Sequence, residues 1–435
     1  MQWILVAGYT GLILALMPRI AFFRLPSIPA TWLQGMFVLK VLAGISLGLV
    51  YSRYYTDKST ADTFKFFDDS RIIFESLRDN PKDFLRMFTG YHADAQDLKE
   101  KYYMGMTAWN NKEMFFNDNR SIIRLNVLFQ FISLGYYYVH IVLLNLFSFT
   151  GLICMYKFLN RGLENKNKLF FLALFLFPSL LFWGSGLLKD GLLLFSVGIF
   201  LYFFQSIFIE KKISLLTVAG FLLGITGLLF NKFYILFMLL PAVTAYYFCT
   251  KSQVNYIRKF SIVYSLFALI FFSSKYVSPQ FDFLKILETK RTSFEQIAVS
   301  GNARHLLELP NTPLTTFSFL KQIPQAFSRV LFRPYLWEAD SAPVLLSALE
   351  NFFLTLSVLL LLFFVKRGTK PFPLLLFSVG FILTLFIFIG MITPVLGAMV
   401  RYRIIGIPFL IFILLGLMDT VRVKAWFQKI LNSKA

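Results

Sequence analysis

Five charged residues interrupt or open apolar runs, where a charge is costly and therefore marks a candidate site. Lys189 and Asp190 follow a Gly-Ser-Gly break, Lys232 stands at a second break, and Arg401 and Arg403 open the last run. Basic groups that converge in a partly dehydrated place neutralise a phosphate, and Arg adds paired donors. We therefore expect a site for a lipid-linked phosphate or diphosphate. The alternative is that Lys189 pairs with Asp190 while the other residues anchor helix ends.

A carboxylate is the second ingredient of this chemistry, and Asp62, shortly after the second apolar run, is the candidate. It could act as a general base on a hydroxyl, or as a ligand for a divalent metal such as Mg²⁺ or Mn²⁺. The alternative is a helix N-cap, because Asp62 and Thr63 precede an amphipathic segment. Asp68 and Asp69 are expected on the solvated face of that segment.

A cluster of aromatic and charged residues ends the second long polar segment. It comprises Arg333, Tyr335, Trp337, Glu338 and Asp340. Sugar rings stack on Trp or Tyr, while carboxylates and Arg bond to hydroxyl groups. The cluster therefore predicts carbohydrate binding. An interfacial aromatic belt would explain the two rings, but it does not explain the two acids.

Membrane-spanning helices must position these groups, because 57% of the 435 residues are hydrophobic and 18% are aromatic. With a mean hydropathy of +0.65, the chain is predicted to be an all-α polytopic membrane protein with one transmembrane domain, 1–435. A span needs about 20 apolar residues. We expect about eleven spans, at 2–17, 32–52, 136–157, 168–183, 187–208, 214–230, 232–250, 260–276, 344–365, 373–391 and 399–418.

Charge along the chain predicts its orientation. Basic residues fall in alternate short loops, whereas the long segments 53–120 and 278–342 contain 18 of the 23 acids. Cytoplasmic loops are rich in Lys and Arg, which places the N-terminus and both long segments outside and the C-terminus inside. Because the net charge of +20 is spread over helix ends, it does not indicate nucleic-acid binding.

Further sequence features concern the first apolar run, the two cysteines, helix starts and known catalytic motifs. The run 2–17 lacks a basic leading region and a small-residue cleavage site, so we interpret it as a retained helix. Cys154 and Cys249 lie in apolar runs and predict no disulfide, metal or redox role. Asn80 before Pro81 predicts a helix start. Short amphipathic helices are expected in both long segments. HExxH, P-loop and GxSxG patterns are absent, which gives no support to metalloprotease, ATPase or serine-hydrolase function.

Three stretches carry a resemblance to a family: 177–190, 332–338 and 397–403. The chain resembles the polytopic GT-C-type glycosyltransferases, and more closely the bacterial membrane proteins of surface-polysaccharide gene clusters. In such proteins an Asp of the first long outer loop acts on the acceptor, and basic residues at outer helix ends hold a polyprenyl-phosphate sugar. The resemblance implies these roles for Asp62 and for Lys189, Arg401 and Lys232. One departure is the extra apolar run before the first long loop.

These observations predict a bacterial inner-membrane glycosyltransferase. It would transfer a sugar from a polyprenyl-phosphate-linked donor to a glycan or lipid acceptor on the outer face, in contact with membrane lipid. One alternative is an O-antigen or exopolysaccharide polymerase or ligase that uses an undecaprenyl-diphosphate-linked glycan and depends on Arg304, Arg333, Arg401 and Arg403. Another is a transporter or a non-catalytic envelope-assembly subunit, which Lys40 keeps open unless that side chain snorkels to the interface.

Overall fold

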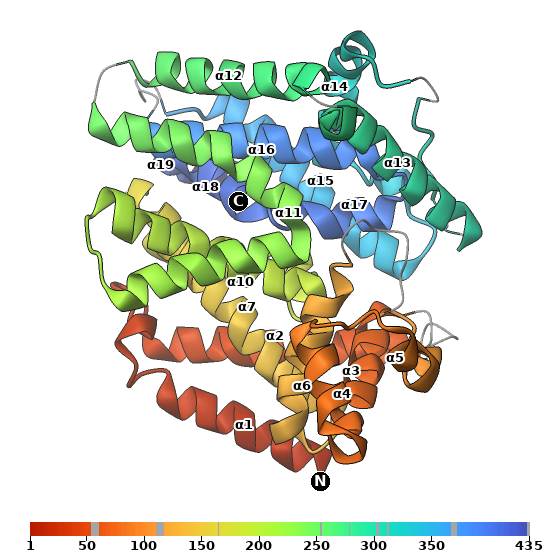
Figure 1. Cartoon of the computed structure of the whole chain (residues 1–435). Coiled ribbons are helices and arrows are strands. Elements are labelled where there is room, and N and C mark those ends of the chain that lie inside the picture. Colours follow the sequence, from red (N-terminus) through yellow and green to blue (C-terminus); the bar gives the residue numbers. More distant parts are fainter. Residues whose placement is uncertain are drawn as a thin grey trace. The chain divides into compact units, whose positions relative to one another are not determined.

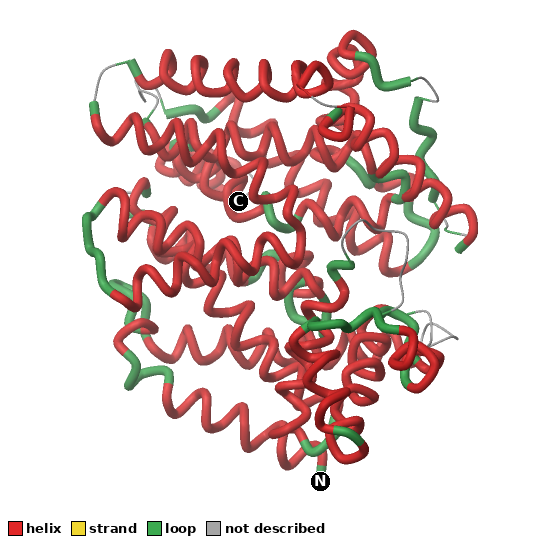
Figure 2. The backbone as a smooth tube through the Cα atoms, viewed as in Figure 1, coloured by secondary structure: helices red, strands yellow, loops and turns green. Residues whose placement is uncertain are grey.

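A computed structural model of the chain describes residues 1–53, 61–109, 117–163, 165–252, 255–277, 279–301, 303, 305–310, 313–366 and 372–432. These residues form helices joined by loops, and no strand occurs among them (Figures 1 and 2). The predicted all-α class is confirmed. Contacts divide the chain into two compact units, the first of residues 1–155 and 175–233, the second of 156–174 and 234–435.

The first unit begins with two apolar helices and continues into a group of shorter helices (Figure 1). Its helices are α1 (Gln2–Leu16), α2 (Ala30–Arg53), α3 (Asp62–Asp79), α4 (Pro81–Thr89), α5 (Gln96–Lys101), α6 (Asn119–Ser133), most of α7 (Tyr137–Leu159), α9 (Pro178–Trp183), α10 (Lys189–Phe204) and the first half of α11 (Leu215–Lys251).

The second unit contains the rest of α7 and α11 and all later helices. These are α8 (Asn167–Phe175), α12 (Tyr256–Val277), α13 (Phe283–Ser300), α14 (Thr316–Phe332), α15 (Ala342–Phe363), α16 (Pro373–Ile392), α17 (Leu396–Arg403), α18 (Ile407–Leu417) and α19 (Thr420–Asn432). Helix α16 packs against α14 and α18, and a small core of Leu287, Leu314, Ala326, Met391 and Ile392 joins α13, α14 and α16.

Seven helices in the described residues are long and apolar enough to cross a membrane, or eight if the pair α17 and α18, bent by 64°, forms one span. They are α2, α7, α10, α11, α12, α15 and α16. The polytopic class therefore stands, while the predicted count of eleven is not confirmed. Helix α1 has only 15 residues, and the predicted run 168–183 is broken into α8 and α9 before Pro178, whose ring cannot continue a helix.

The predicted runs 214–230 and 232–250 form one helical segment, α11, whose backbone leaves the helical region at Lys232 (φ −148°, ψ 82°). The predicted break is therefore present, as a kink rather than a loop. Asn231 is 2% exposed, and its side chain donates to the Gly227 carbonyl at 2.7 Å and accepts from the Ser121 hydroxyl at 3.1 Å. These bonds tie the end of the first half of α11 to α6 within the first unit.

Helices α3 to α6 form a packed group in the segment 53–120 and just beyond it. Phe66, Phe67 and Ile73 point into its core, as the amphipathic pattern predicted, and α3 packs against α4 and α6. The expected helix start is confirmed, because the Asn80 side chain accepts from the Lys82 backbone N–H at 3.1 Å, and Pro81 is the first helical residue. A folded helical group therefore occupies the first long polar segment.

Candidate functional site

Two helices hold the Gly-Ser-Gly break that precedes α10. The Lys40 ammonium on α2 donates to the Gly184 carbonyl at 2.6 Å and to the Ser185 hydroxyl at 3.0 Å. From α7, Ser148 donates to the same Gly184 carbonyl at 2.7 Å, and Asn145 donates to the Ser185 carbonyl at 2.9 Å. Gly184 is the residue at which α9 ends, so these donors satisfy carbonyls that a helix terminus leaves open.

Lys40 does not snorkel to the interface, which corrects the sequence interpretation. Its side chain is 1% exposed, because the break offers acceptors inside the protein. The close fit also depends on Gly44, where an added Cβ would lie 2.4 Å from the Ser185 carbonyl oxygen. The backbone of α2 therefore lies directly against the break, and the position of the first residue of α10 depends on this packing.

Lys189 opens α10 and reaches across to the start of α6. Its ammonium donates to Asp118 Oδ1 and to Asn119 Oδ1, each at 2.7 Å, and the Lys189 and Asp118 side chains are 14% and 15% exposed. The ion pair is therefore with Asp118, whereas the sequence alternative paired Lys189 with Asp190. Asp190 is 1% exposed in the first turn of α10, where a carboxylate complements the positive end of the helix dipole.

Lys189 approaches α3 at Phe66, one helical turn after Asp62. The Lys189 ammonium lies 5.9 Å from the centroid of the Phe66 ring. Asp62 precedes Phe66 by four residues in α3, and residues at that spacing are neighbours on one helix face. Asp62 is half-buried and is the first residue of the helix, whereas Ala61 occupies the N-cap position. The alternative that Asp62 caps α3 is therefore wrong.

Asp69 is a residue that sequence analysis placed incorrectly. It is 1% exposed, not solvated, because its carboxylate accepts backbone N–H groups from Thr107 at 3.0 Å, Ala108 at 2.8 Å and Trp109 at 2.7 Å. Burial raises the pKa of Asp69, and the three N–H groups oppose that shift. Asp68, one residue earlier, is exposed as expected. Asp69 therefore anchors the segment 107–109 to α3.

Trp109, held by Asp69, is the centre of a second set of contacts in the first unit. Its ring is fully buried, and the guanidinium groups of Arg120 and Arg124 lie 4.7 Å and 5.2 Å from its centroid. Arg120 also binds Asp94 through two bonds of 2.5 Å and 3.1 Å, which lowers the pKa of that carboxyl. Arg120 follows the Asn119 that binds Lys189, so these contacts set the position of the partners of Lys189.

In the second unit, the predicted sugar-binding residues form a compact turn. Arg333 binds the Glu338 carboxylate through Nε at 2.8 Å and through a second guanidinium nitrogen, while the Tyr335 backbone N–H donates to the other carboxylate oxygen at 2.8 Å. The rings of Tyr335 and Trp337 stack at 4.7 Å, and Trp337 is 81% exposed. The stacked pair thus offers an exposed aromatic face beside a charged pair.

Arg403 donates to acceptors inside the second unit. It is 1% exposed, and one guanidinium nitrogen donates to the carbonyls of Val330 at 3.1 Å and Arg333 at 3.0 Å and to the Asn351 side chain at 2.7 Å. Its other terminal nitrogen lies 3.4 Å from Glu350. Because these carbonyls end α14, Arg403 satisfies open groups of a helix terminus.

The other basic candidates have different surroundings. Arg401 is half-buried in α17, in the same unit as Arg403, and Lys232 is buried at the kink of α11. Arg304 lies outside the described residues. Lys189 belongs to the first unit, whereas Arg333, Arg401 and Arg403 belong to the second. Their predicted role in binding one phosphate stays a prediction.

His305 and Asp340 form a pair that the sequence did not indicate. The His305 Nε2 atom lies 2.8 Å from Asp340 Oδ1, and the two side chains are 22% and 51% exposed. His305 has a left-handed backbone (φ 58°), and its carbonyl accepts from the Leu396 N–H at 3.4 Å. A separation of 35 residues leaves no local pattern that would have indicated this pair.

Comparison with known proteins adds no assignment, since no family model, no curated protein and no solved structure matches this chain.

Across the described part of the chain, no group of three or more His, Cys, Asp or Glu side chains is placed to hold a metal ion. The site in the first unit is therefore defined by Lys189 with Asp118 and Asn119, by Asp62 one turn away on α3, and by the break that positions α10.

Proposed function

We propose that this protein is a membrane glycosyltransferase that moves a sugar from a polyprenyl-phosphate donor to a hydroxyl acceptor at the outer face of a bacterial inner membrane. The single observation that supports it most is that the Lys189 ammonium approaches α3 at Phe66, one turn from Asp62, although Lys189 and Asp62 are 127 positions apart in the sequence. The transfer requires a cation for the leaving phosphate and a carboxylate for the acceptor hydroxyl.

In the proposed reaction, the Asp62 carboxylate accepts the proton of the acceptor hydroxyl. The acceptor oxygen then attacks the anomeric carbon, and the bond between that carbon and the phosphate oxygen breaks with inversion. The electron pair leaves with the polyprenyl phosphate, whose growing negative charge the Lys189 ammonium stabilises. Two N–H groups of Lys189 bind Asp118 and Asn119, so the ammonium is held in one orientation.

The second unit supports the carbohydrate part of the proposal. Trp337 is exposed and stacked on Tyr335, next to the Arg333 and Glu338 pair, which is the combination that sugar rings and hydroxyl groups use. Arg403 is assigned no ligand, since its two terminal guanidinium nitrogens bind acceptors inside the second unit. Each proposed step uses the side chains of the protein itself.

The test is transfer in proteoliposomes that contain the purified chain, a polyprenyl-phosphate donor with a radiolabelled sugar, and an outer-face glycan extract. We expect labelled glycan from the wild type and none above background from D62N. The matched control is D68N, since Asp68 is an exposed acid on the same helix. If D62N transfers sugar at the wild-type rate, the stated mechanism fails.

The same assay separates the proposal from its rivals. A ladder of products, rather than a single addition, would identify a polymerase that uses a diphosphate-linked glycan. Uptake of the donor sugar into vesicles without formation of labelled glycan would identify a transporter. Both outcomes would overturn the transferase proposal: gel mobility of the products identifies the ladder, and label retained inside the vesicles identifies uptake.

A further inference from the structure

A groove of about 520 Å³ lies between α4 and the turn after it. None of the residues that line it belongs to the candidate site around Lys189. The lining residues are Lys82, Leu85, Arg86, Thr89, Tyr91, His92 and Ala95. They come from the helical group in the first long polar segment, so the groove lies outside the candidate membrane spans.

The helix periodicity accounts for one wall of the groove. Lys82, Leu85, Arg86 and Thr89 are spaced by three or four residues and share one face of α4. Helix α4 ends at Gly90, whose φ of +91° is a left-handed conformation that glycine adopts without a steric penalty. The chain turns back at this point and forms the opposite wall.

Tyr91 and His92 form that opposite wall. Tyr91 is 72% exposed, and its ring meets the His92 ring at right angles with 4.4 Å between centroids. His92 has a left-handed backbone (φ 49°), an uncommon conformation for a residue other than glycine. Leu85, 55% exposed, faces the groove from α4. An aromatic ring and an aliphatic side chain therefore present apolar surface from two sides.

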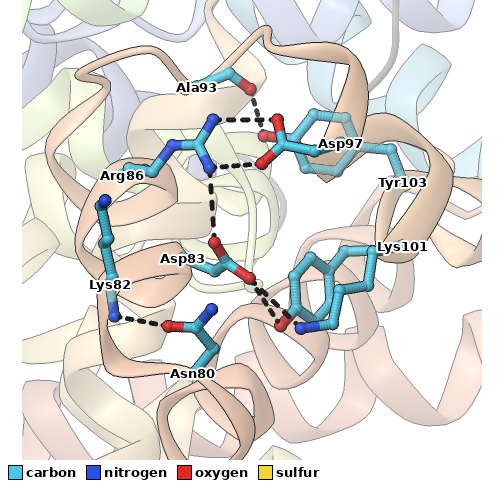
Figure 3. Close-up of polar contacts among 9 residues, drawn as sticks. Asn80, Lys82, Asp83, Arg86, Ala93, Asp97, Lys101 and Tyr103 are labelled. Carbon is cyan, nitrogen blue, oxygen red and sulfur yellow. Dashed lines mark hydrogen bonds and ion pairs between the residues drawn. The ribbon is translucent and has the colours of Figure 1, made fainter.

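Arg86 is held in place by two acids, Asp97 and Asp83 (Figure 3). Its terminal nitrogens donate to the Asp97 carboxylate at 2.5 Å and 3.0 Å and to Asp83 at 3.4 Å. Asp83 also binds Lys101 at 3.2 Å and the Tyr102 hydroxyl at 3.3 Å. The guanidinium is therefore ordered before any ligand arrives, which reduces the entropy that binding costs.

Lys82 carries the positive charge of the lining that no acid offsets, because Arg86 is paired with Asp97 and Asp83. Lys82, Arg86 and His92 are basic types, and no carboxylate occurs among the lining residues. The described residues offer the Lys82 ammonium no acceptor, since only the backbone N–H of Lys82 makes a bond, to Asn80. Apolar and aromatic walls beside the Lys82 ammonium suit a sugar that carries a carboxylate, because the ring stacks while the ammonium binds the acid.

We propose that this groove binds an acidic saccharide, namely a uronate-containing segment of the acceptor glycan. The inference rests on the proposed function and deepens it, because it gives the acceptor a binding place in the same unit as Asp62. The sugar ring stacks on Tyr91 against Leu85, and the uronate carboxylate binds the Lys82 ammonium with the Arg86 side chain beside it.

The experiment measures binding of trigalacturonate to the full chain in lipid nanodiscs by isothermal titration calorimetry, without any donor. We expect saturable binding that K82Q and Y91A each weaken about tenfold, the factor that loss of one charged hydrogen bond or one stacking ring produces. Maltotriose, a neutral trisaccharide, should bind at least about tenfold more weakly. Matched controls are K99Q and Y276A, exposed residues outside the groove lining, which should not change the affinity.

Three results would overturn the inference: no saturable binding to the wild type, equal affinity for maltotriose, or an equal loss in K99Q. The outcome is independent of catalysis because no sugar is transferred. If trigalacturonate binds as expected while the transfer assay yields no product, the groove stands and the proposed transferase mechanism fails. If transfer occurs without trigalacturonate binding, the groove inference fails and the proposed transferase mechanism stands.

Discussion

Each unit contains a break between two consecutive helices, and in each a buried cation donates to the carbonyls of a helix end. In the first unit Lys40 binds the Gly184 carbonyl at the end of α9. In the second, Arg403 binds the carbonyls of Val330 and Arg333 at the end of α14 and itself ends α17, where the chain bends by 64°. Cations are favourable there because carbonyls concentrate negative charge at a helix C-terminus.

The two breaks differ in which helix carries the second basic residue, since Arg401 lies on α17 together with Arg403. In the first unit a second basic residue, Lys189, begins the next helix and remains 14% exposed beside Asp118. In the second unit Arg403 is itself the residue at the bend, and its terminal nitrogens bind internal acceptors. A cation at a break is therefore fully buried, as Lys40 and Arg403 are, or partly exposed, as Lys189 is. In the first unit, the buried cation, Lys40, and the candidate ligand-binding cation, Lys189, are therefore different residues.

The largest expected effect is at Arg403. R403M removes bonds to two carbonyls and to Asn351 and takes the cation away from Glu350, so we expect a loss of about 3–5 kcal/mol of stability. The measurement is thermal unfolding in detergent. The double variant E350Q/R403M should recover part of the loss, because no carboxylate then remains without its cation. A stable R403M protein that has lost transfer would instead indicate a ligand-binding role for Arg403. Arg403 and Lys189 would then not differ in function.

Lys189 should show the opposite behaviour. K189Q keeps a polar side chain at the start of α10, so we expect near-normal stability and a fall in transfer of about 100-fold, the effect of removing one donor to a developing anion. The rate in proteoliposomes and the unfolding temperature are measured together. K189R, which keeps the charge, should recover part of the rate. Unfolding of K189Q without a specific loss of rate would make Lys189 a second structural cation.

Asp69 tests whether the acceptors of Lys189 depend on the neighbouring helical group. D69N replaces one accepting oxygen by an NH₂ group that faces backbone donors, and we expect a loss of about 2 kcal/mol. Hydrogen exchange of residues 107–109 should rise in D69N. D68N, on the exposed side of α3, is the control and should leave exchange unchanged. If hydrogen exchange of residues 107–109 is the same in D69N and D68N, then Asp69 does not hold this segment in place.

Lys40 is expected to matter less than Arg403. K40M removes two bonds, but Ser148 still donates to the Gly184 carbonyl, so we expect a loss of about 1 kcal/mol. Thermal unfolding of K40M and R403M under the same conditions gives the comparison directly. A loss in K40M as large as in R403M would show that the two cations contribute equally to their breaks.

The smallest effect concerns pH and the Asp94 and Arg120 pair. Because Arg120 lowers the pKa of Asp94 in the folded protein, the pair stabilises the fold above the unfolded pKa, about 4, and this stabilisation is lost as pH falls through the lower folded value. R120Q should return the pKa of Asp94 towards its ordinary value, measured by NMR titration, and should flatten the loss of stability in acid. An unchanged pKa in R120Q would contradict the assigned cause.

Local sequence patterns predicted the features that depend on neighbouring residues. The apolar runs predicted an all-helical polytopic chain, Asn80 with Pro81 predicted a helix start, and the Asn231 and Lys232 pair predicted a break that is present as a kink. Each depends on side chains and backbone groups within a turn or two, where spacing alone sets the geometry.

Run length was a weaker guide to the number of spans. Hydropathy does not register Pro178, which breaks one predicted span. The sequence likewise placed Asp69 on a solvated face, because the amphipathic pattern of α3 does not include the segment 107–109 that covers it.

Amino-acid order alone specifies the helical membrane class of this protein and the places where a charge or a break occurs. Tertiary packing selects the group that each charge meets: Asp118 for Lys189 across 71 positions, Gly184 for Lys40 across 144, and Asp340 for His305 across 35. The physical reason is that a charged group in an apolar protein must find an acceptor, and packing of distant helices determines which acceptor lies within reach.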